Sequence, residues 1–395
     1  MPRSATSFPK LWKAGFWQDA WDTPAPPIGN ISSLDGFRGI GIFLVMNEHF
    51  SNGFVHFGGH VFLGGFFVMS GFLITAILLY EHQTKGRVDG RNFYRRRAAR
   101  LLPALWVGLC ANLILGAIGY FRFEYVAIEV LGNFFYLYLA SYAYLVAHHG
   151  KVVMPQLWTL NVEEWFYVLW FVKLARVTRR PFNAGKTFRN MTIFSVMLIG
   201  ILTAVAIAFT LGLGGFFVPN PISLMMLGCV LAVYRKSFVH RKELDQLHPL
   251  ELLIIRWSTT VGLIMTVILY SLDIISDRAR VLADGTAAIP AFLIILGLAL
   301  GQSPRIANVF SWKPLVHIGQ IIYGMYIWHF TLFLLFNGPD IPHLGEHPAR
   351  PIWWNIIVLG ALSYVVALIS WHLVERPMVN RYRSSKRTSA AASSR

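Results

Sequence analysis

An arginine and a histidine stand eleven residues apart in an otherwise largely apolar segment, LDGFRGIGIFLVMNEHF (residues 34–50). At about 100° per residue this spacing returns Arg38 and His49 to nearly one face of a helix, about 16 Å apart along its axis. Ionisable groups deep in a membrane helix are costly and usually mark a pathway or a reaction site. Arg38 and His49 are therefore predicted to line one wall of a pathway or reaction site. The alternative is that they are buried polar groups that only pack helices together.

Two other apolar segments carry polar side chains. QLWTLNVEEWFYVLW contains Glu163 and Glu164, and IIYGMYIWHF contains Tyr326 and His329. A neutral imidazole is the usual general base near pH 7, and a carboxylate bonded to it fixes its tautomer. Two histidines and several carboxylates could meet in one polar cavity. No metal is expected, because no histidine pair at i, i+4 comes with a third ligand at a recognisable distance.

The most basic stretch is GRNFYRRRAARLLPALW, interpreted as a loop that leads into an apolar span. Arg97 and Arg100 fall one helical turn apart, so their guanidinium groups could clamp a phosphate-bearing ligand at the membrane surface. Anchoring to lipid head groups is the alternative, because basic residues are common at cytoplasmic helix ends.

Composition indicates the kind of secondary structure that carries these residues. The chain is 55% hydrophobic and only 14% charged, with a mean hydropathy of +0.52. Soluble domains average about 25% charged residues, so the sequence predicts an all-α polytopic membrane protein. Ten spans are expected, near residues 36–56, 58–80, 101–120, 158–174, 190–210, 215–234, 257–275, 285–303, 315–336 and 352–373.

Charge distribution supports ten spans with both termini in the cytoplasm. This topology places 29 of the 35 lysines and arginines on the inner side and five outside, with Arg38 in the first span. Cytoplasmic loops collect such residues. An eleventh span at 128–147 would invert every later loop, so that stretch is predicted to be re-entrant or interfacial. The net charge of +16 then reflects contact with anionic lipids, and nucleic-acid binding is not expected.

The chain divides into three parts on this basis. Residues 1–33 are predicted to form a cytoplasmic tail, residues 34–377 a transmembrane domain, and residues 378–395 a disordered basic cytoplasmic tail. Glu375, Arg376 and Pro377 are expected to end the last span, since proline stops helices. A multi-pass protein of the inner or plasma membrane follows from this organisation.

Six motifs in this order resemble acyltransferase family 3, whose members acylate sugars and related hydroxyl compounds. They are LDGFRGIGIFLVMNEH, FFVMSGFLIT, FYRRRAARLLPALW, LWTLNVEEWFY, YGMYIWH and VERP, between about residues 34 and 377. The resemblance implies that an acyl group, most simply acetyl, passes from cytoplasmic acyl-CoA to a hydroxyl of a cell-envelope carbohydrate or glycolipid. No bound cofactor is implied, because acyl-CoA is the donor substrate.

The same resemblance suggests roles for individual residues. Arg38 and His49 match an essential Arg-x10-His motif, and Arg97 and Arg100 match an Arg-x-x-Arg motif expected to hold the donor. His49 would act as general base or as transient acyl carrier, and the sequence does not separate these roles. Glu163 is the candidate to orient His49 or the acceptor. His329 and Tyr326 would line the acceptor route, although Tyr326 could equally be an interface anchor.

The chain departs from the family pattern at two places. Many relatives have an acidic residue before the paired phenylalanines of the second helix, where this chain has Gly64 and Gly65 before Phe66. Conversely, Glu48 stands beside His49, where relatives often have an apolar residue. We hypothesise that Glu48 replaces the missing charge and lines the cavity.

Other functions are compatible with the sequence. A transporter or flippase would also need many spans and buried ionisable residues, but no inverted repeat is evident. A cytoplasmic-facing enzyme that modifies a small metabolite is a second alternative. No fused extracellular transfer domain is expected, so a separate extracytoplasmic protein could accept the acyl group.

Overall fold

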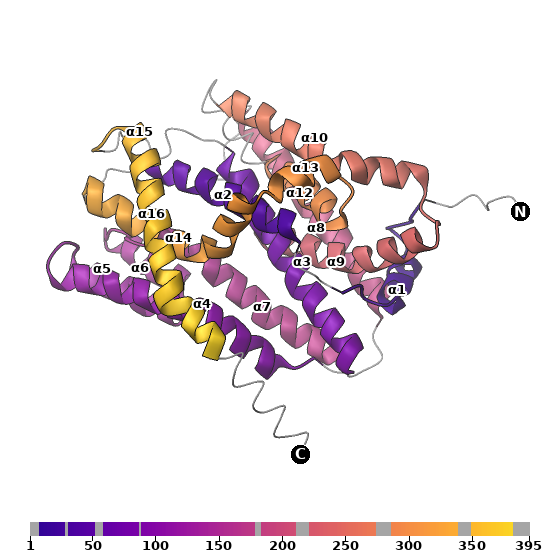
Figure 1. The fold of residues 1–395 in the computed structure, drawn as a ribbon, viewed down its shortest axis with the longest axis horizontal. Coiled ribbons are helices and arrows are strands. Elements are labelled where there is room, and N and C mark those ends of the chain that lie inside the picture. Colours follow the sequence, from indigo (N-terminus) through magenta and orange to yellow (C-terminus); the bar gives the residue numbers. More distant parts are fainter. Residues whose placement is uncertain are drawn as a thin grey trace, which may run out of the picture. The chain divides into compact units, whose positions relative to one another are not determined.

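The computed structural model of the chain describes residues 8–27, 31–51, 58–86, 88–177, 183–210, 221–273, 286–338 and 349–381. These residues form helices and connecting turns only, as the sequence predicts (Figure 1). The elements are α1 (Ala14–Asp22), α2 (Ser32–Phe50), α3 (Gly59–Lys85), α4 (Gly90–Ala117), α5 (Phe123–Phe134), α6 (Tyr138–Ala147), η1 (Pro155–Leu157), α7 (Trp158–Val177), α8 (Ala184–Thr210), α9 (Pro221–Glu243), α10 (Pro249–Asp273), α12 (Ala288–Leu300), α13 (Pro304–Phe310), α14 (Lys313–Asn337), α15 (Ile352–Trp354), η2 (Asn355–Leu359), α16 (Gly360–Ser370) and η3 (Trp371–Glu375).

Within the described residues, six helices are long and apolar enough to cross a membrane. They are α3, α4, α9, the 249–271 part of α10, α14 and the continuous stretch Ile352–Arg381. The pair α12 and α13, bent by 97°, would make a seventh span. The protein is therefore a multi-pass membrane protein by helix length and composition.

Two of the predicted spans contain several charged residues and are not among these six helices. The predicted spans 36–56 and 158–174 overlap α2 and α7. However, α2 carries Asp35, Arg38 and Glu48, and α7 carries Glu163, Glu164 and Lys173. Each helix is therefore more charged than a typical membrane span.

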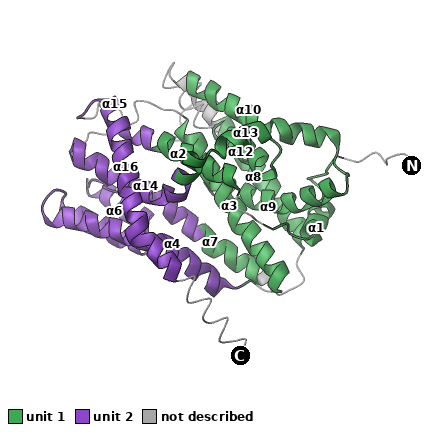
Figure 2. Ribbon diagram, viewed as in Figure 1, with its two compact units in different colours: residues 1–45, 56–88, 166–317 green, residues 46–55, 89–165, 318–395 purple. Residues whose placement is uncertain are grey.

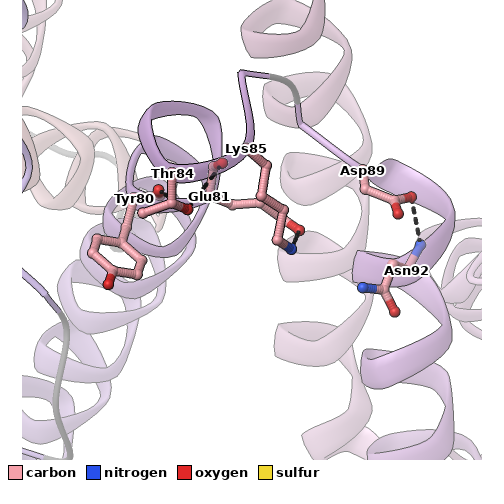
Figure 3. A network of polar contacts seen from close by, with 6 residues as sticks. All are labelled: Tyr80, Glu81, Thr84, Lys85, Asp89 and Asn92. Carbon is pink, nitrogen blue, oxygen red and sulfur yellow. Dashed lines mark hydrogen bonds and ion pairs between the residues drawn. The ribbon is translucent and has the colours of Figure 1, made fainter. Parts of the chain in front are cut away.

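The basic stretch around Arg97 is helical, so the predicted loop is wrong. Helix α4 begins at Gly90, because the Asp89 side chain caps it by accepting a 3.0 Å hydrogen bond from the Asn92 backbone N–H (Figure 3). Such a cap satisfies an otherwise unpaired donor of the first turn. Arginine, alanine and leucine then favour helix through residues 95–102. Arg97 and Arg100 thus lie on a helix that continues into the apolar segment.

The last helix also extends beyond its predicted end. It runs past Pro377 to Arg381, and the predicted tail beyond Arg381 lies outside the described residues. A π-helical turn, η3, directly precedes Arg376 and Pro377. This wider turn relaxes the helix where proline cannot donate a hydrogen bond.

Contacts divide the chain into two compact units (Figure 2). Unit 1 comprises Met1–Val45, His56–Val88 and Phe166–His317, and in it α3 packs against α9 and α12. A Cβ on Gly71 would lie 1.9 Å from the Met225 carbonyl oxygen, and one on Gly228 would lie 2.0 Å from the Val68 carbonyl oxygen. These two glycines therefore permit the close packing of α3 against α9.

Unit 2 comprises Met46–Val55, Asp89–Trp165 and Ile318–Arg395. Its core includes Leu105, Leu109, Leu157 and Ile327, which bring together α4, η1 and α14. The buried Asn112 amide donates a 3.0 Å hydrogen bond to the Thr331 hydroxyl, which connects α4 to α14. The predicted re-entrant or interfacial stretch 128–147 is not one helix, because the chain turns at Tyr136 (φ 56°) between α5 and α6.

Candidate functional site

Two histidines from distant parts of the sequence meet in unit 2. His49 lies at the C-terminal end of α2 and His329 lies within α14. Their ring centroids are 5.2 Å apart, with an angle of 42° between the planes. Phe330 packs edge-on against His49, and Phe50 packs edge-on against His329, with centroid distances of 5.3 and 6.1 Å. The imidazoles therefore lie in largely aromatic surroundings.

Hydrogen bonding defines the tautomer of His329. Its Nδ1 lies 2.9 Å from the Tyr326 carbonyl oxygen, one helical turn earlier. A carbonyl can only accept, so Nδ1 carries the proton in the neutral ring, and Nε2 presents a lone pair. This Nε2 is buried and has no hydrogen-bond partner among the described residues. A buried nitrogen with an available lone pair can accept a proton or a hydroxyl hydrogen bond.

Tyr326 connects α14 to the start of α7. Its hydroxyl lies 2.6 Å from the Thr159 hydroxyl and donates to the Gln156 carbonyl. The Gln156 amide in turn donates a 3.3 Å hydrogen bond to the Ile327 carbonyl. These bonds attach the part of α14 around Tyr326 to η1 and α7. They therefore help to hold the Tyr326 carbonyl that accepts the hydrogen bond from His329.

A chain of buried amides holds the helix end that carries His49. The Asn355 amide donates a 3.1 Å hydrogen bond to the carbonyl of Phe50, the residue after His49. Asn337 donates a 3.1 Å hydrogen bond to the Asn355 side-chain oxygen and accepts one from the Arg350 backbone N–H at 3.0 Å. Because buried carbonyls are costly to leave unpaired, these bonds fix the C-terminal turn of α2.

Arg97 is held by carboxylates of α7. Its Nε and Nη2 atoms each lie 2.6 Å from Glu164 Oε1, and Nη2 lies 3.9 Å from Glu163 Oε2. The three side chains are 22%, 15% and 21% exposed, so solvent can still reach them. The structure thus places Glu163 beside Arg97. The suggested role of Glu163 in orienting His49 stays a prediction.

A known protein family matches the part of the chain that contains these residues. A family model described as an acyltransferase domain, that of acyltransferase family 3, matches residues 31–372. The chain belongs to this family. The match includes His49, Arg97, Glu163 and His329, so the resemblance inferred from the motifs is confirmed.

Curated relatives of the family are similar over most of this chain. The O-acetyltransferase OatA of Staphylococcus aureus (strain NCTC 8325 / PS 47) is 26% identical over 367 residues, which cover 88% of this chain and 57% of OatA. The "Putative peptidoglycan O-acetyltransferase YrhL" of Bacillus subtilis (strain 168) is 24% identical over 376 residues, 88% of this chain and 55% of YrhL. The chain therefore spans little more than half the length of these relatives. No solved structure matches it.

The other predicted site residues of this acyltransferase-family chain occupy different surroundings. Arg38 lies in unit 1, where its Nη1 is 3.2 Å from Asp35 Oδ1, one turn earlier on α2. Arg100 is exposed on α4, and its charge acts on the buried carboxylate of Glu375. Glu48 is partly buried in unit 2, and its carbonyl accepts a hydrogen bond from Ser51. The suggested roles of these residues stay predictions.

Glu129 is a buried polar residue of unit 2 that was not among the predicted site residues, and it holds the segment before η1 in place. Glu129 accepts hydrogen bonds from the backbone N–H groups of Val153 (2.7 Å) and Met154 (3.2 Å). Burial raises the pKa of Glu129 to about 8, although the two N–H groups act in the opposite direction. The signal in the sequence is a carboxylate inside an apolar run.

Metal binding has no candidate among the residues that the structure describes. No group of three or more His, Cys, Asp or Glu side chains there could hold an ion. The expectation of metal-independent chemistry stays a prediction.

Proposed function

We propose that this chain is an integral membrane O-acyltransferase that moves an acyl group, most simply acetyl, from acyl-CoA to a hydroxyl of a cell-envelope carbohydrate or glycolipid. The contact between His49 and His329 carries the proposal. Both residues lie inside the matched acyltransferase domain, and their ring centroids are 5.2 Å apart, with the buried His329 presenting a lone pair at Nε2 beside the partly buried His49.

The two roles proposed for His49 correspond to two reaction routes. As general base, His49 takes the proton of the acceptor hydroxyl while the hydroxyl oxygen attacks the thioester carbonyl; the C–S bond then breaks, and His49 returns the proton to the leaving sulfur, so CoA leaves as the thiol. As acyl carrier, a ring nitrogen of His49 attacks the thioester carbonyl, the C–S bond breaks, and CoA leaves as the thiol with the imidazole proton. The acceptor hydroxyl then attacks the acyl-imidazole, the C–N bond breaks, and the hydroxyl proton returns to the His49 ring. In both routes His329 Nε2 accepts a hydrogen bond from the acceptor hydroxyl or from the His49 ring.

The donor binds at the basic end of α4 in this proposal. Arg97 and Arg100 hold phosphates of acyl-CoA, and Arg38 orients the donor. Guanidinium groups suit this role because they bind phosphate through two parallel hydrogen bonds. The proposed topology, with about ten spans and both termini in the cytoplasm of an inner or plasma membrane, places this end at the cytoplasmic donor.

The acceptor class follows from the relatives. OatA and YrhL are named for O-acetylation, and the name of YrhL specifies peptidoglycan. Because this chain spans little more than half of each, a carbohydrate acceptor at the membrane and a separate acyl-accepting protein are both compatible with the proposal.

Sided proteoliposomes test the function. Radiolabelled acetyl-CoA is supplied on one side only, and a cell-envelope glycan extract is enclosed on the other. We expect base-labile label on the glycan when the donor faces the basic end of α4. Intact acetyl-CoA accumulating inside the vesicles, without labelled glycan, would instead indicate a transporter.

A further inference from the structure

A cavity opens beyond the end of α4 that lies away from the arginine cluster. Its volume is about 450 Å³, within the range of small-molecule sites. The lining residues belong to unit 2 and come from the turn after α4, from the start of α5 and from the segment before η1: Gly119, Tyr120, Phe121, Arg122, Tyr125, His149, Lys151 and Val153.

The position of the cavity along α4 indicates its side of the membrane. Helix α4 spans 28 residues, and at about 1.5 Å per residue it is about 42 Å long, enough to cross a hydrocarbon core of about 30 Å. Arg97 and Arg100 lie toward the N-terminal end, and the cavity follows the C-terminal end. The cavity therefore opens on the side opposite the proposed donor site.

The lining combines cations with aromatic rings. Arg122, Lys151 and His149 supply basic groups, and none of the described residues that line the cavity is acidic. Tyr120, Phe121 and Tyr125 supply rings, and the Arg122 guanidinium lies 5.8 Å from the Tyr125 ring centroid. Aromatic rings pack against the apolar face of a sugar, and cations pair with carboxylate or phosphate. This combination suits a saccharide that bears an anionic group.

Hydrogen bonds to neighbouring elements hold two parts of the cavity wall. The Tyr120 hydroxyl donates to the carbonyls of Leu334 (3.1 Å) and Leu335 (2.7 Å), which attaches one wall to α14. Glu129 accepts from the Val153 N–H and so holds the segment that contributes Lys151 and Val153. Two parts of the cavity wall are thus attached to other elements, Tyr120 to α14 and Val153 to α5.

An apolar layer connects the cavity to the histidine pair. Phe121 and Val153 line the cavity and also belong to a cluster with Leu334, against which Phe330 packs. The Phe330 ring contacts the His49 ring edge-on at 5.3 Å. Phe330 thus contacts both the His49 ring and the apolar cluster that contributes to the cavity wall.

We propose that this cavity is the acceptor subsite and binds a saccharide carrying a carboxylate or phosphate, with Arg122 and Lys151 pairing with the anion. The inference rests on the proposed function. It adds the side of entry, the residues and the charge of the acceptor.

Direct ligand binding tests the subsite without requiring acyl transfer. Saturation-transfer NMR on the full chain in zwitterionic nanodiscs, with no acyl donor present, compares N-acetylmuramic acid with N-acetylglucosamine, which lacks the lactyl carboxylate. We expect the acidic sugar to bind at least tenfold more tightly than the neutral one. Arg122→Gln and Lys151→Gln should abolish this preference, while Arg122→Lys retains part of it. Arg350→Gln, in a residue outside the cavity lining that packs on Trp354, should have no effect.

Three outcomes would overturn the subsite. They are equal affinity for the two sugars, an unchanged preference in both charge-removing variants, and displacement of the sugar by an equal concentration of dihexanoylphosphatidylglycerol, which would assign the cavity to lipid head groups. Acetyl-CoA hydrolysis by the same variants separates the two proposals. If the subsite fails, wild-type hydrolysis persists, whereas failure of the proposed function abolishes hydrolysis but leaves sugar binding intact.

Discussion

The imidazole rings of His49 and His329 lie 5.2 Å apart, although the two residues are 280 positions apart in the sequence. This contact joins the end of α2 to the interior of α14. His329 presents Nε2 because Nδ1 is bonded to the Tyr326 carbonyl. The two ring nitrogens of His329 therefore differ in hydrogen bonding, since Nε2 has no partner among the described residues, and substitution can test them separately.

Replacing His329 by Asn or Gln distinguishes these functions. Asn can keep a donor near the Nδ1 position but supplies nothing at Nε2, whereas Gln can place a polar atom near Nε2. We expect His329→Asn to lower kcat by about 100-fold, in the range of a lost proton acceptor. His329→Gln should retain more activity. Steady-state transfer rates on folded protein, verified by size exclusion in detergent, provide the comparison, and equal activity of Asn and wild type would show that Nε2 is not used.

Removing the Asn355 amide should affect catalysis through the position of His49. Asn355→Ala frees the Phe50 carbonyl, so the last turn of α2 loses a constraint. We expect kcat to fall about tenfold with little change in KM, because a small misplacement of a reacting group is costly.

Ser363→Ala is the matched control for Asn355. Ser363 is a buried residue of α16 whose hydroxyl has no hydrogen-bond partner among the described residues. Its activity should equal that of wild type. A similar loss in both variants would indicate general destabilisation of the last helix.

Arg97→Lys tests the donor site. Lysine keeps the charge beside Glu164 but cannot form two parallel bonds to phosphate. We expect KM for acetyl-CoA to rise about tenfold, equivalent to about 1.4 kcal/mol. Arg95→Lys, at an exposed position on the same helix, should leave KM unchanged. A change in kcat alone for Arg97→Lys would argue against donor binding.

Glu129 should make stability depend on pH. Burial raises its pKa from 4.5 to about 8, so the folded state holds this proton more tightly than the unfolded state. Its stabilising contribution is therefore present below about pH 4.5 and is lost as the pH rises toward 8. In detergent, the Tm of wild type should be lower by about 2–4 °C at pH 8.5 than at pH 6 because of this group.

Glu129→Gln should reduce that difference. The glutamine oxygen can still accept from Val153 and Met154, because both N–H groups reach Glu129 Oε2, at 2.7 and 3.2 Å. Glu124→Gln, an exposed substitution on the same helix, should behave as wild type. An undiminished pH effect in Glu129→Gln would show that another group causes it.

The helices were predictable where hydrophobic runs are long, and less so where capping decides. Each predicted span overlaps a described helix, because about 20 apolar residues are a strong signal. The start of α4 at Gly90 was missed, since Asp89 caps a turn that hydropathy does not detect. The helix end at Pro377 was misplaced because a local π-turn accommodates the proline.

The site was predictable as a set of residue types but not as a set of contacts. His49, His329, Arg97 and Glu163 stood out as ionisable groups in or beside apolar segments. Periodicity relates residues of one helix only, so it could not indicate that Arg97 pairs with Glu164 across two helices. Asn355 was not selected, because a neutral amide is inconspicuous in a sequence.

The most direct test of the acyltransferase proposal compares wild type with His49→Ala in lipid, supplied with radiolabelled acetyl-CoA and a cell-envelope glycan acceptor. We predict that wild type consumes the thioester and labels the glycan, and that His49→Ala, with an unchanged Tm and elution profile, does neither at a measurable rate. Equal labelling by the two proteins would contradict a reaction at His49. No labelling or thioester loss by wild type, with longer acyl donors also inactive, would contradict acyl transfer itself.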